Sequence, residues 1–152
     1  MQNVKCKMQN VKPAADGAQR RVERAPAARP PRDLSERLLE FAAHAGKVVN
    51  SLLANRMGRH IAGQFVRSGT SPGPNYEEAC VAESRADFVH KLSICLKELR
   101  ESRFWIRLIV RSDLLSAKKT GDIEDESAQL CKIIAQSLVT AKKNARNAAA
   151  RT

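Results

Sequence analysis

Residues 67–109 read RSGTSPGPNYEEACVAESRADFVHKLSICLKELRESRFWIRLI. Counted from Val81, small and apolar residues recur at alternating steps of four and three: Phe88, Leu92, Cys95, Leu99, Ser102, Ile106 and Ile109. This spacing keeps side chains on one seam of an α-helix. The pattern therefore predicts one long helix whose seam faces a hydrophobic core.

Two further lines of side chains follow the same predicted helix. The mixed line contains acidic, basic and apolar residues, namely Asp87, Lys91, Ile94, Glu98, Glu101, Trp105 and Leu108. The arginine line consists of Arg100, Arg103, Arg107 and Arg111. It extends over about three turns, or roughly 16 Å at a rise of ~1.5 Å per residue. The mixed line suits a second contact surface, and the arginine line suits an acidic partner.

The composition indicates a single basic domain. A length of 152 residues suits one domain, and the 4% aromatic content means that its core must be aliphatic. The formal net charge is +11; residues 1–32 hold eight Lys or Arg and two Asp or Glu, and residues 33–152 hold nineteen and fourteen. Such a surplus favours phosphate-rich partners or anionic lipid, and a soluble basic protein without such a partner is the alternative.

The cysteines and the hydropathy pattern point to the cytoplasm. Cys6, Cys80, Cys95 and Cys131 show no metal-ligand spacing, and at least two fall on apolar helix faces, where a thiol acts as a small hydrophobe. No apolar run approaches the ~18–20 residues that span a bilayer. The initial MQNVKCKMQNVK lacks the apolar segment of a signal peptide. We expect a cytoplasmic protein in a reducing compartment with no membrane partner.

Residues 1–32 form a separate segment. They contain MQNVK twice, at 1–5 and 8–12, followed by a stretch rich in Ala, Arg and Pro. Ordering this segment would cost conformational entropy and bury little apolar surface, so we expect a disordered basic tail. The alternatives are a flexible arm on nucleic acid, or a repeat that is an accident of the coding region. The arm would use Arg20, Arg21, Arg24, Arg29 and Arg32.

The first predicted helix begins at Asp33, because Asp33-Leu-Ser-Glu36 has the form of a capping box. It extends to about residue 55, where Asn55-Arg56-Met57-Gly58 ends or bends it. Its inward face consists of Leu34, Leu38, Phe41, Ala45, Val48 and Leu52.

The second predicted helix has an inward face of Ile61, Phe65 and Val66 and a basic side of Arg56, Arg59 and Arg67. Pro72-Gly73-Pro74 then predicts a break or kink, because proline removes backbone donors and restricts the residue before it. Helical character resumes at Asn75, and Ser84-Arg-Ala-Asp87 is a second capping box that restarts the long helix. A short irregular elbow is therefore expected between the two helices.

Residues 113–121 are polar and end in Thr120-Gly121, which predicts a loop. Acidic residues crowd the start of the next helix and basic residues its end, so both complement the helix dipole. These are Asp122, Glu124, Asp125 and Glu126, then Lys142, Lys143 and Arg146. The inward residues are Ile123, Leu130, Ile134, Leu138 and Ala141, and fraying is expected from Asn147.

Four helical segments with short loops and no strand pattern predict an all-α fold, an antiparallel four-helix bundle over residues 33–147. The disordered basic tail at 1–32 and a frayed C-terminus at 148–152 flank it. A dimer of helical hairpins is the alternative.

The segments RSGTS, NYEEA and ADFVHKLSICLKELRESRFWIRLI carry a resemblance to a known family. The chain resembles the four-helix bundle proteins related to those encoded in intervening sequences of bacterial 23S rRNA genes, over about residues 33–143. The resemblance implies a small bundle that assembles into a ring, usually a pentamer, with no established enzymatic activity. The accessory protein of diversity-generating retroelements is similar, with a basic ring that binds reverse transcriptase and nucleic acid.

The family pattern extends over the elbow and the long helix. The matching residues are Arg67, Ser68, Ser71, Asn75 and Glu78, then Phe88, Leu92, Glu98, Glu101 and Trp105. The chain departs from the family at Pro72 and Pro74, where relatives commonly carry an aliphatic residue and Ala. These prolines put in doubt the continuity of the helix through the elbow and the subunit contact that it supports.

The sequence offers little for catalysis or metal binding. Di-iron bundles use two Glu-x-x-His pairs, whereas this chain has one related pair, Asp87-x-x-His90, and Glu40 with His44 at another spacing. His44, His60 and His90 are surface or helix-packing residues on the simpler interpretation. No nucleophile or phosphate loop accompanies Glu98 and Glu101. We expect no enzyme activity, no catalytic residue, no metal and no cofactor.

The functional expectation is a homo-oligomer, a pentameric ring by the resemblance, that binds RNA or DNA backbone through a basic surface. Its predicted nucleic-acid-binding residues are Arg59, Arg67, Arg100, Arg103, Arg107 and Arg111. The predicted interface residues are Asn75, Glu78, Glu98, Glu101 and Trp105, with the carboxylates paired to arginines such as Arg67 or Arg100. The alternatives are a protein-binding adaptor, arginines that only pair with nearby acids, and a plain solvated face.

Overall fold

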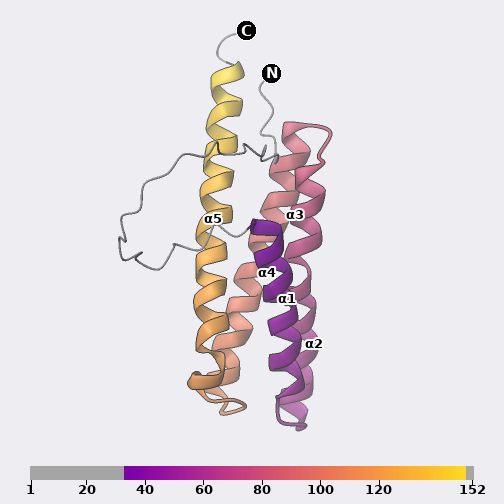
Figure 1. Ribbon diagram of the computed structural model, residues 1–152, viewed down its shortest axis with the longest axis vertical. Coiled ribbons are helices and arrows are strands. Elements are labelled where there is room, and N and C mark those ends of the chain that lie inside the picture. The colour runs from indigo at the N-terminus through magenta and orange to yellow at the C-terminus, as the bar shows by residue number, and fades with distance from the viewer. Residues whose placement is uncertain (1–32, 150–152) are drawn as a thin grey trace, which may run out of the picture. The chain divides into compact units, whose positions relative to one another are not determined.

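The computed structural model describes residues 33–149, and the side chains of residues 33–144. The predictions for residues 1–32, for Arg146 and for residues 150–152 therefore lie outside the described residues. Within them the chain forms helices without strands: α1 (Leu34–Asn50), α2 (Arg56–Thr70), α3 (Pro72–Cys80), α4 (Arg85–Arg111) and α5 (Ala117–Ala149). Helices α2 and α3 run end to end in the same direction and together form one helix of the bundle. The chain is therefore an antiparallel four-helix bundle, as predicted (Figure 1).

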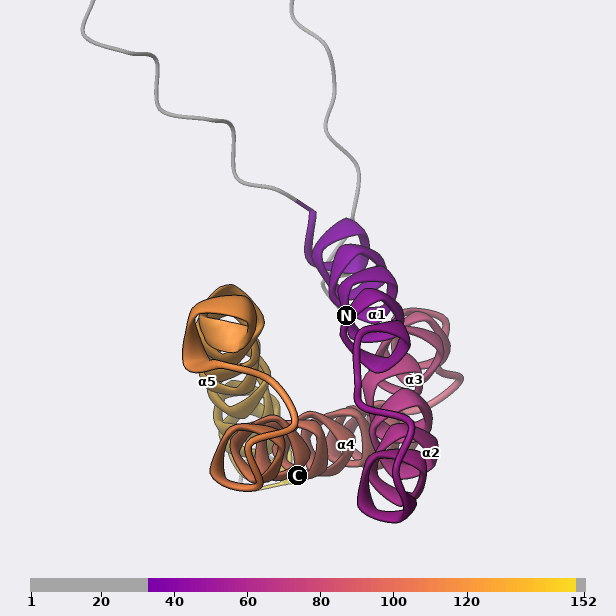
Figure 2. The ribbon, with the colours of Figure 1, turned by 90° about the horizontal axis from the view of Figure 1, so that it is seen from below.

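Helix α4 is central to the bundle. It packs against α5 on one side and against α2 and α3 on the other. Helix α1 contacts α2, α3 and α5 and lies diagonally opposite α4 (Figure 2). On the α5 side of α1, the Arg37 guanidinium donates to both carboxylate oxygens of Glu126, at 2.8 and 3.0 Å. Two faces of α4 are thus covered by neighbouring helices, and its remaining face is turned outward.

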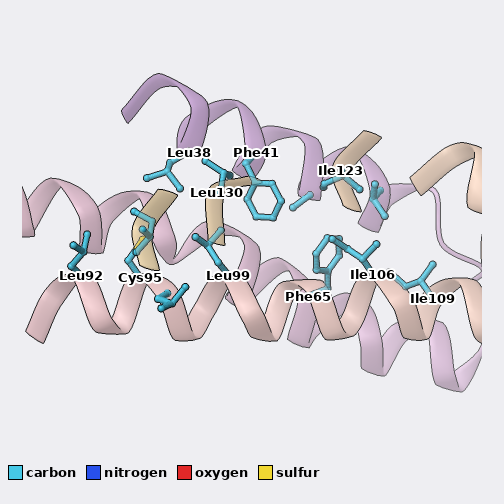
Figure 3. Close-up of a cluster of buried hydrophobic side chains, with 14 of the residues drawn as sticks. Leu38, Phe41, Phe65, Leu92, Cys95, Leu99, Ile106, Ile109, Ile123 and Leu130 are labelled. Atoms are coloured by element: carbon cyan, nitrogen blue, oxygen red, sulfur yellow. The ribbon is translucent and has the colours of Figure 1, made fainter. Parts of the chain in front are cut away.

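The predicted seam of α4 forms the middle of the core. Leu92, Cys95, Leu99 and Ile106 are almost fully buried and meet side chains of the other helices (Figure 3). The core residues from those helices include Leu38, Phe41, Phe65, Ile123, Leu130 and Ile134. Burying each large aliphatic side chain contributes about 1.5–3 kcal/mol, so the aliphatic seam supplies much of the driving force for folding. Phe88 is half-buried against this core.

Helix caps predicted from the sequence are confirmed at two helix starts. The Asp33 carboxylate accepts a hydrogen bond from Ser35 N at 3.3 Å, and Ser84 Oγ accepts one from Asp87 N at 3.1 Å. Each bond satisfies a backbone donor that has no partner inside the helix. Helix α4 therefore begins at Arg85, and Val81, which was counted on the seam, lies before it and is 80% exposed.

The predicted end of the first helix is wrong by about five residues. Helix α1 ends at Asn50 and not near 55, because Asn55 caps the next helix. Its Oδ1 accepts a hydrogen bond from Gly58 N at 2.7 Å, so the segment 55–58 starts α2 instead of ending α1. Leu52 lies between the helices and still packs against the core.

The prediction that Val66 faces inward is also wrong. Val66 is 37% exposed, whereas Ile61 and Phe65 are fully buried as predicted. The inward face of α2 continues instead through Ser68 and Gly69, which are both buried. These small residues allow a close approach, since a Cβ built on Gly69 would lie 2.8 Å from Ala45 Cβ.

The predicted break at the prolines is confirmed, because α2 ends at Thr70 and α3 begins at Pro72, but the predicted irregular elbow is wrong. Ser71 keeps a helical backbone, with φ −70° and ψ −32°, and Pro72 takes the first position of α3, where a missing N–H costs little. The Asn75 amide donates to the Ser71 carbonyl oxygen at 2.9 Å, which strengthens the joint. The chain reverses later, in residues 81–84 between α3 and α4.

The predicted loop at residues 113–121 is too long. Helix α5 begins at Ala117, so Thr120 and Gly121 lie inside it, and Thr120 is fully buried. The turn is made at Asp113, whose φ of 53° lets Leu114 N donate to Ile109 O at 3.1 Å. Acidic residues 122–126 consequently lie beyond the first turn of α5 and do not cap it. Helix α5 also extends to Ala149, beyond the predicted boundary at 147.

Candidate nucleic-acid interface

The arginine line lies on the outward side of α4. Its four side chains are exposed, and within the described residues none of them forms an ion pair with Asp or Glu. Arg100 and Arg103 lie on the side of α4 that faces Cys131 of α5. Burial raises the pKa of the Cys131 thiol, and the positive charges of Arg103 and Arg100 oppose this rise. Four guanidinium groups on one helix side, with no carboxylate partner in the described part of the chain, give a concentrated positive field.

Arg107 and Arg111 border a shallow depression on the same helix. Phe104 and Leu108 complete its lining, and its volume is about 150 Å³. The residues lie at positions i, i+3, i+4 and i+7, so all belong to one face of α4. An aromatic ring, an aliphatic side chain and two cations therefore meet at one surface site.

The other two predicted nucleic-acid-binding arginines lie on α2 and have partners within the chain. Arg67 Nη2 donates to Glu101 Oε1 at 2.7 Å and to Gln64 Oε1 at 3.4 Å. Arg59 Nη1 donates to the carbonyl oxygen of Ala54 at 2.7 Å. Within residues 33–144, the six predicted arginines thus separate into a line on α4 without carboxylate partners and two locally bonded side chains on α2.

The mixed line is largely in contact with α2 and α3 of the same chain. Lys91 forms an ion pair with Glu78 of α3, and this partner raises the pKa of Lys91. Fourteen residues further along α4, or about 21 Å, Trp105 Nε1 donates to Glu101 Oε1 at 3.2 Å. The Trp105 ring also meets the edge of His60 on α2, with the ring centroids 6.1 Å apart.

The five predicted interface residues are therefore spread along the bundle and not gathered at one point. Asn75 bonds to Ser71 within the α2–α3 joint, while Glu78 and Glu101 have basic partners in the same chain. Glu98 differs, because its Oε2 atom is buried and has no hydrogen-bond partner among the described residues. Among the described residues, Glu98 is therefore the carboxylate of this set that still needs a hydrogen-bond donor.

Comparison with known proteins places the chain in a family. The family model described as 23S rRNA-intervening sequence protein matches residues 35–136. The chain belongs to this family. A solved structure from Bacteroides thetaiotaomicron, described as a protein with unknown function from the S23 ribosomal protein family, is 32% identical with a TM-score of 0.66. The match covers 70% of this chain and 98% of that one. No curated protein matches.

Membership of the 23S rRNA-intervening sequence protein family agrees with the resemblance carried by residues 67–109. The match includes all of α2, α3 and α4 and most of α1 and α5. Residues 1–32 lie outside it, as the sequence predicted. The family match supports the bundle architecture, while the description of the solved relative assigns it no function.

Phe104 is the surface residue that the sequence argument missed. Its side chain is 58% exposed, and its ring lies edge-on to Trp105 with the centroids 5.1 Å apart. Phe104 belongs to neither the seam nor the two lines, so a periodicity search passes over it. The available signal was its position between Arg103 and Arg107, which places an aromatic residue inside a basic line.

The cysteines and histidines do not assemble a site in the described part of the chain. Between residues 33 and 144, no three or more His, Cys, Asp or Glu residues lie close enough together to hold a metal ion. Burial raises the pKa of the Cys95 thiol to about 12, with a smaller contribution from Cys131. Cys95 therefore remains a neutral core side chain near pH 7. No described helix is both long and apolar enough to span a bilayer.

Proposed function

We propose that this protein is a non-enzymatic homo-oligomer that binds the phosphate backbone of RNA or DNA through the arginine line of α4. The supporting observation is that Arg100, Arg103, Arg107 and Arg111 are exposed on one helix and lack carboxylate partners within the described chain. Binding phosphates would release condensed counterions, so this mode recognises charge and shape and not base sequence. Arg59 and Arg67 extend the basic surface onto α2.

Association between copies would present several arginine lines together. Support comes from large apolar side chains that one chain leaves exposed, including Leu39 at 64%, Val139 at 60% and Leu53 at 55%. The family resemblance implies a pentameric ring, and we adopt that state as part of the proposal.

The experiment is a titration of the full-length chain against a labelled RNA at ~50 mM and ~200 mM salt. The test variant carries Arg103→Glu and Arg107→Glu. The matched control carries Lys142→Glu and Lys143→Glu, which make the same change of charge at exposed positions of α5. Binding should weaken on the order of tenfold or more in the α4 variant only, because each lost cation removes a phosphate contact. Equal weakening in both variants would show that only total charge matters.

The competing candidate is a protein-binding adaptor that docks a partner on the mixed line. The buried Glu98 Oε2 favours this alternative, because a partner could supply the missing hydrogen-bond donor. Glu101 and Trp105 would flank that contact. A pull-down repeated after nuclease treatment separates the two candidates. Partners that survive nuclease support the adaptor, and partners that disappear support nucleic-acid binding.

A further inference from the structure

Phe104 is an aromatic side chain that the packing of the bundle does not explain. The described residues include every Phe, Tyr and Trp of the chain, and the other five side chains are buried or half-buried. Phe104 alone among them is exposed, at 58%. Since its position is off the seam of α4, a polar residue there would leave the core unchanged. The ring is therefore a feature of the surface.

The surroundings of Phe104 combine aromatic, aliphatic and cationic groups. Leu108 and Arg107 flank it one helical turn along α4, and Arg111 follows at the next turn, about 10 Å from Phe104 along the axis. These side chains line the depression of about 150 Å³, and among the described residues no carboxylate contributes to its lining. The depression thus offers an apolar floor beside two cations, which suits a flat apolar ligand that carries negative charge.

The Phe104 ring is also restrained by the neighbouring Trp105 side chain. Trp105 meets the Phe104 ring at an interplanar angle of 78°, in the edge-to-face geometry that stabilises aromatic pairs. Trp105 is fixed in turn by its hydrogen bond to Glu101, which accepts from Arg67 on α2. Because this chain of contacts restrains the ring before any ligand arrives, binding costs less conformational entropy.

We propose that Phe104 stacks on an unpaired base, with Arg107 and Arg111 on the adjoining phosphates, so that the ligand is single-stranded nucleic acid. This inference rests on the proposed function and narrows its ligand class. Bases in a duplex are already stacked on one another and cannot reach a ring on a helix surface, whereas the bases of a single strand can. Charge complementarity favours this ligand over an apolar protein segment, since the depression is bordered by two arginines.

The experiment compares the full-length protein with Phe104→Leu on two ligands at the same salt. One ligand is a single-stranded oligoadenylate without base pairs, and the other is an RNA duplex of equal length. Leu keeps the apolar volume but removes the π face. If Phe104 stacks on one base, Phe104→Leu should lower the affinity for the single strand roughly 5- to 150-fold and change the affinity for the duplex little. Phe104→Tyr should retain single-strand binding, because it keeps the ring.

Two further measurements make the test specific. Trp105 is the only tryptophan, so its fluorescence should change when oligoadenylate stacks on the adjacent ring, and this change should disappear in Phe104→Leu. The matched control is Val81→Ala, which alters an exposed apolar residue before the start of α4. It should leave single-strand affinity within about twofold of wild type.

The outcomes separate this inference from the proposed function. Salt-dependent binding of both ligands that Phe104→Leu leaves unchanged overturns the stacking site but not backbone binding. If neither ligand binds at low salt, both proposals are overturned. A Phe104→Leu variant with a smaller sedimentation coefficient and unchanged RNA affinity would identify the ring as a contact between copies, which also overturns the stacking site.

Discussion

At the scale of single residues, the reversal of the chain between α4 and α5 depends on the backbone conformation of Asp113. Asp113 is the described non-glycine residue with positive φ, at 53°, a conformation that usually selects Gly or Asn. Its N–H donates to Val110 O and that of Leu114 to Ile109 O, both at 3.1 Å, which forms a Schellman motif. The glycine that suggested a loop, Gly121, is helical instead. The loop predicted at residues 113–121 contains this turn but extends too far, because burial of Thr120 inside α5 outweighs local propensity.

Replacing Asp113 with glycine should stabilise the bundle. Glycine adopts positive φ without a steric penalty, so we expect the free energy of unfolding to rise by about 0.5–1 kcal/mol after the entropy cost in the unfolded chain. Chemical denaturation of Asp113→Gly measures this change. The matched control is Asp122→Gly, which places glycine inside α5 and should destabilise by a few tenths of a kcal/mol, or roughly 0.3. Destabilisation by both substitutions would contradict the assigned turn.

The Cys95 thiol should make stability depend on alkaline pH. Its pKa is about 12 in the folded protein, above the ordinary value of about 8.5 in an unfolded chain. The folded state therefore keeps a proton that the unfolded state loses, and stability falls as pH rises from about 9 toward 12. Unfolding free energies between pH 8 and 10 should decline less steeply in Cys95→Ala. Cys80→Ala, at an exposed thiol, should keep the wild-type slope.

At the scale of helices, predictions from the spacing of apolar residues succeeded, and predictions from residues that end helices partly failed. The four-three spacing located the buried seam of α4, and capping residues located the starts of α1 and α4. The prolines at 72 and 74 were interpreted as an elbow, yet a proline in the first turn of α3 fits a helix start. Asn55 was interpreted as a helix end although it caps α2. Each of these residues is compatible with the end of one helix or the start of the next, and only the tertiary structure decides between the two.

The contact between α1 and α2 provides a helix-scale prediction. A side chain on Gly69 would collide with Ala45, whereas a Cβ on Gly63 of the same helix meets nothing within 4 Å. Gly69→Val should therefore reduce stability by about 1–3 kcal/mol, because the helices must separate. Gly63→Val should stay within about 0.5 kcal/mol of wild type. Thermal denaturation of both variants compares them, and equal stabilities would count against the close approach.

At the scale of the whole molecule, the candidate site depends on what one bundle leaves uncovered. The sequence identified the arginine line by spacing alone, and the structure places all four side chains at the surface. It did not identify the depression beside Phe104, because an exposed aromatic residue has no periodic signature. It also could not show that Arg67 and Glu101 pair across α2 and α4 within one chain. Local spacing reveals what shares a helix face, and only the fold reveals which faces meet.

The first prediction at this scale is that copies of the protein associate with one another. The full-length protein should sediment at micromolar concentration with the mass of several subunits, five in the proposed ring. Dilution should lower that mass if exposed apolar residues such as Leu39 and Val139 supply the contact. A single-subunit mass at every concentration would remove the proposed ring.

The most direct test of backbone binding by α4 is the slope of log affinity against log salt concentration for a single-stranded RNA. The comparison is between wild type and a variant with Arg100, Arg103, Arg107 and Arg111 all changed to glutamine. Each phosphate contact contributes about 0.7 to that slope on a single strand. We predict that the slope becomes shallower by about 0.7 for every arginine that contacts a phosphate, approaching ~2.8 if all four do. Parallel plots for the two proteins would contradict the assignment of nucleic-acid binding to α4.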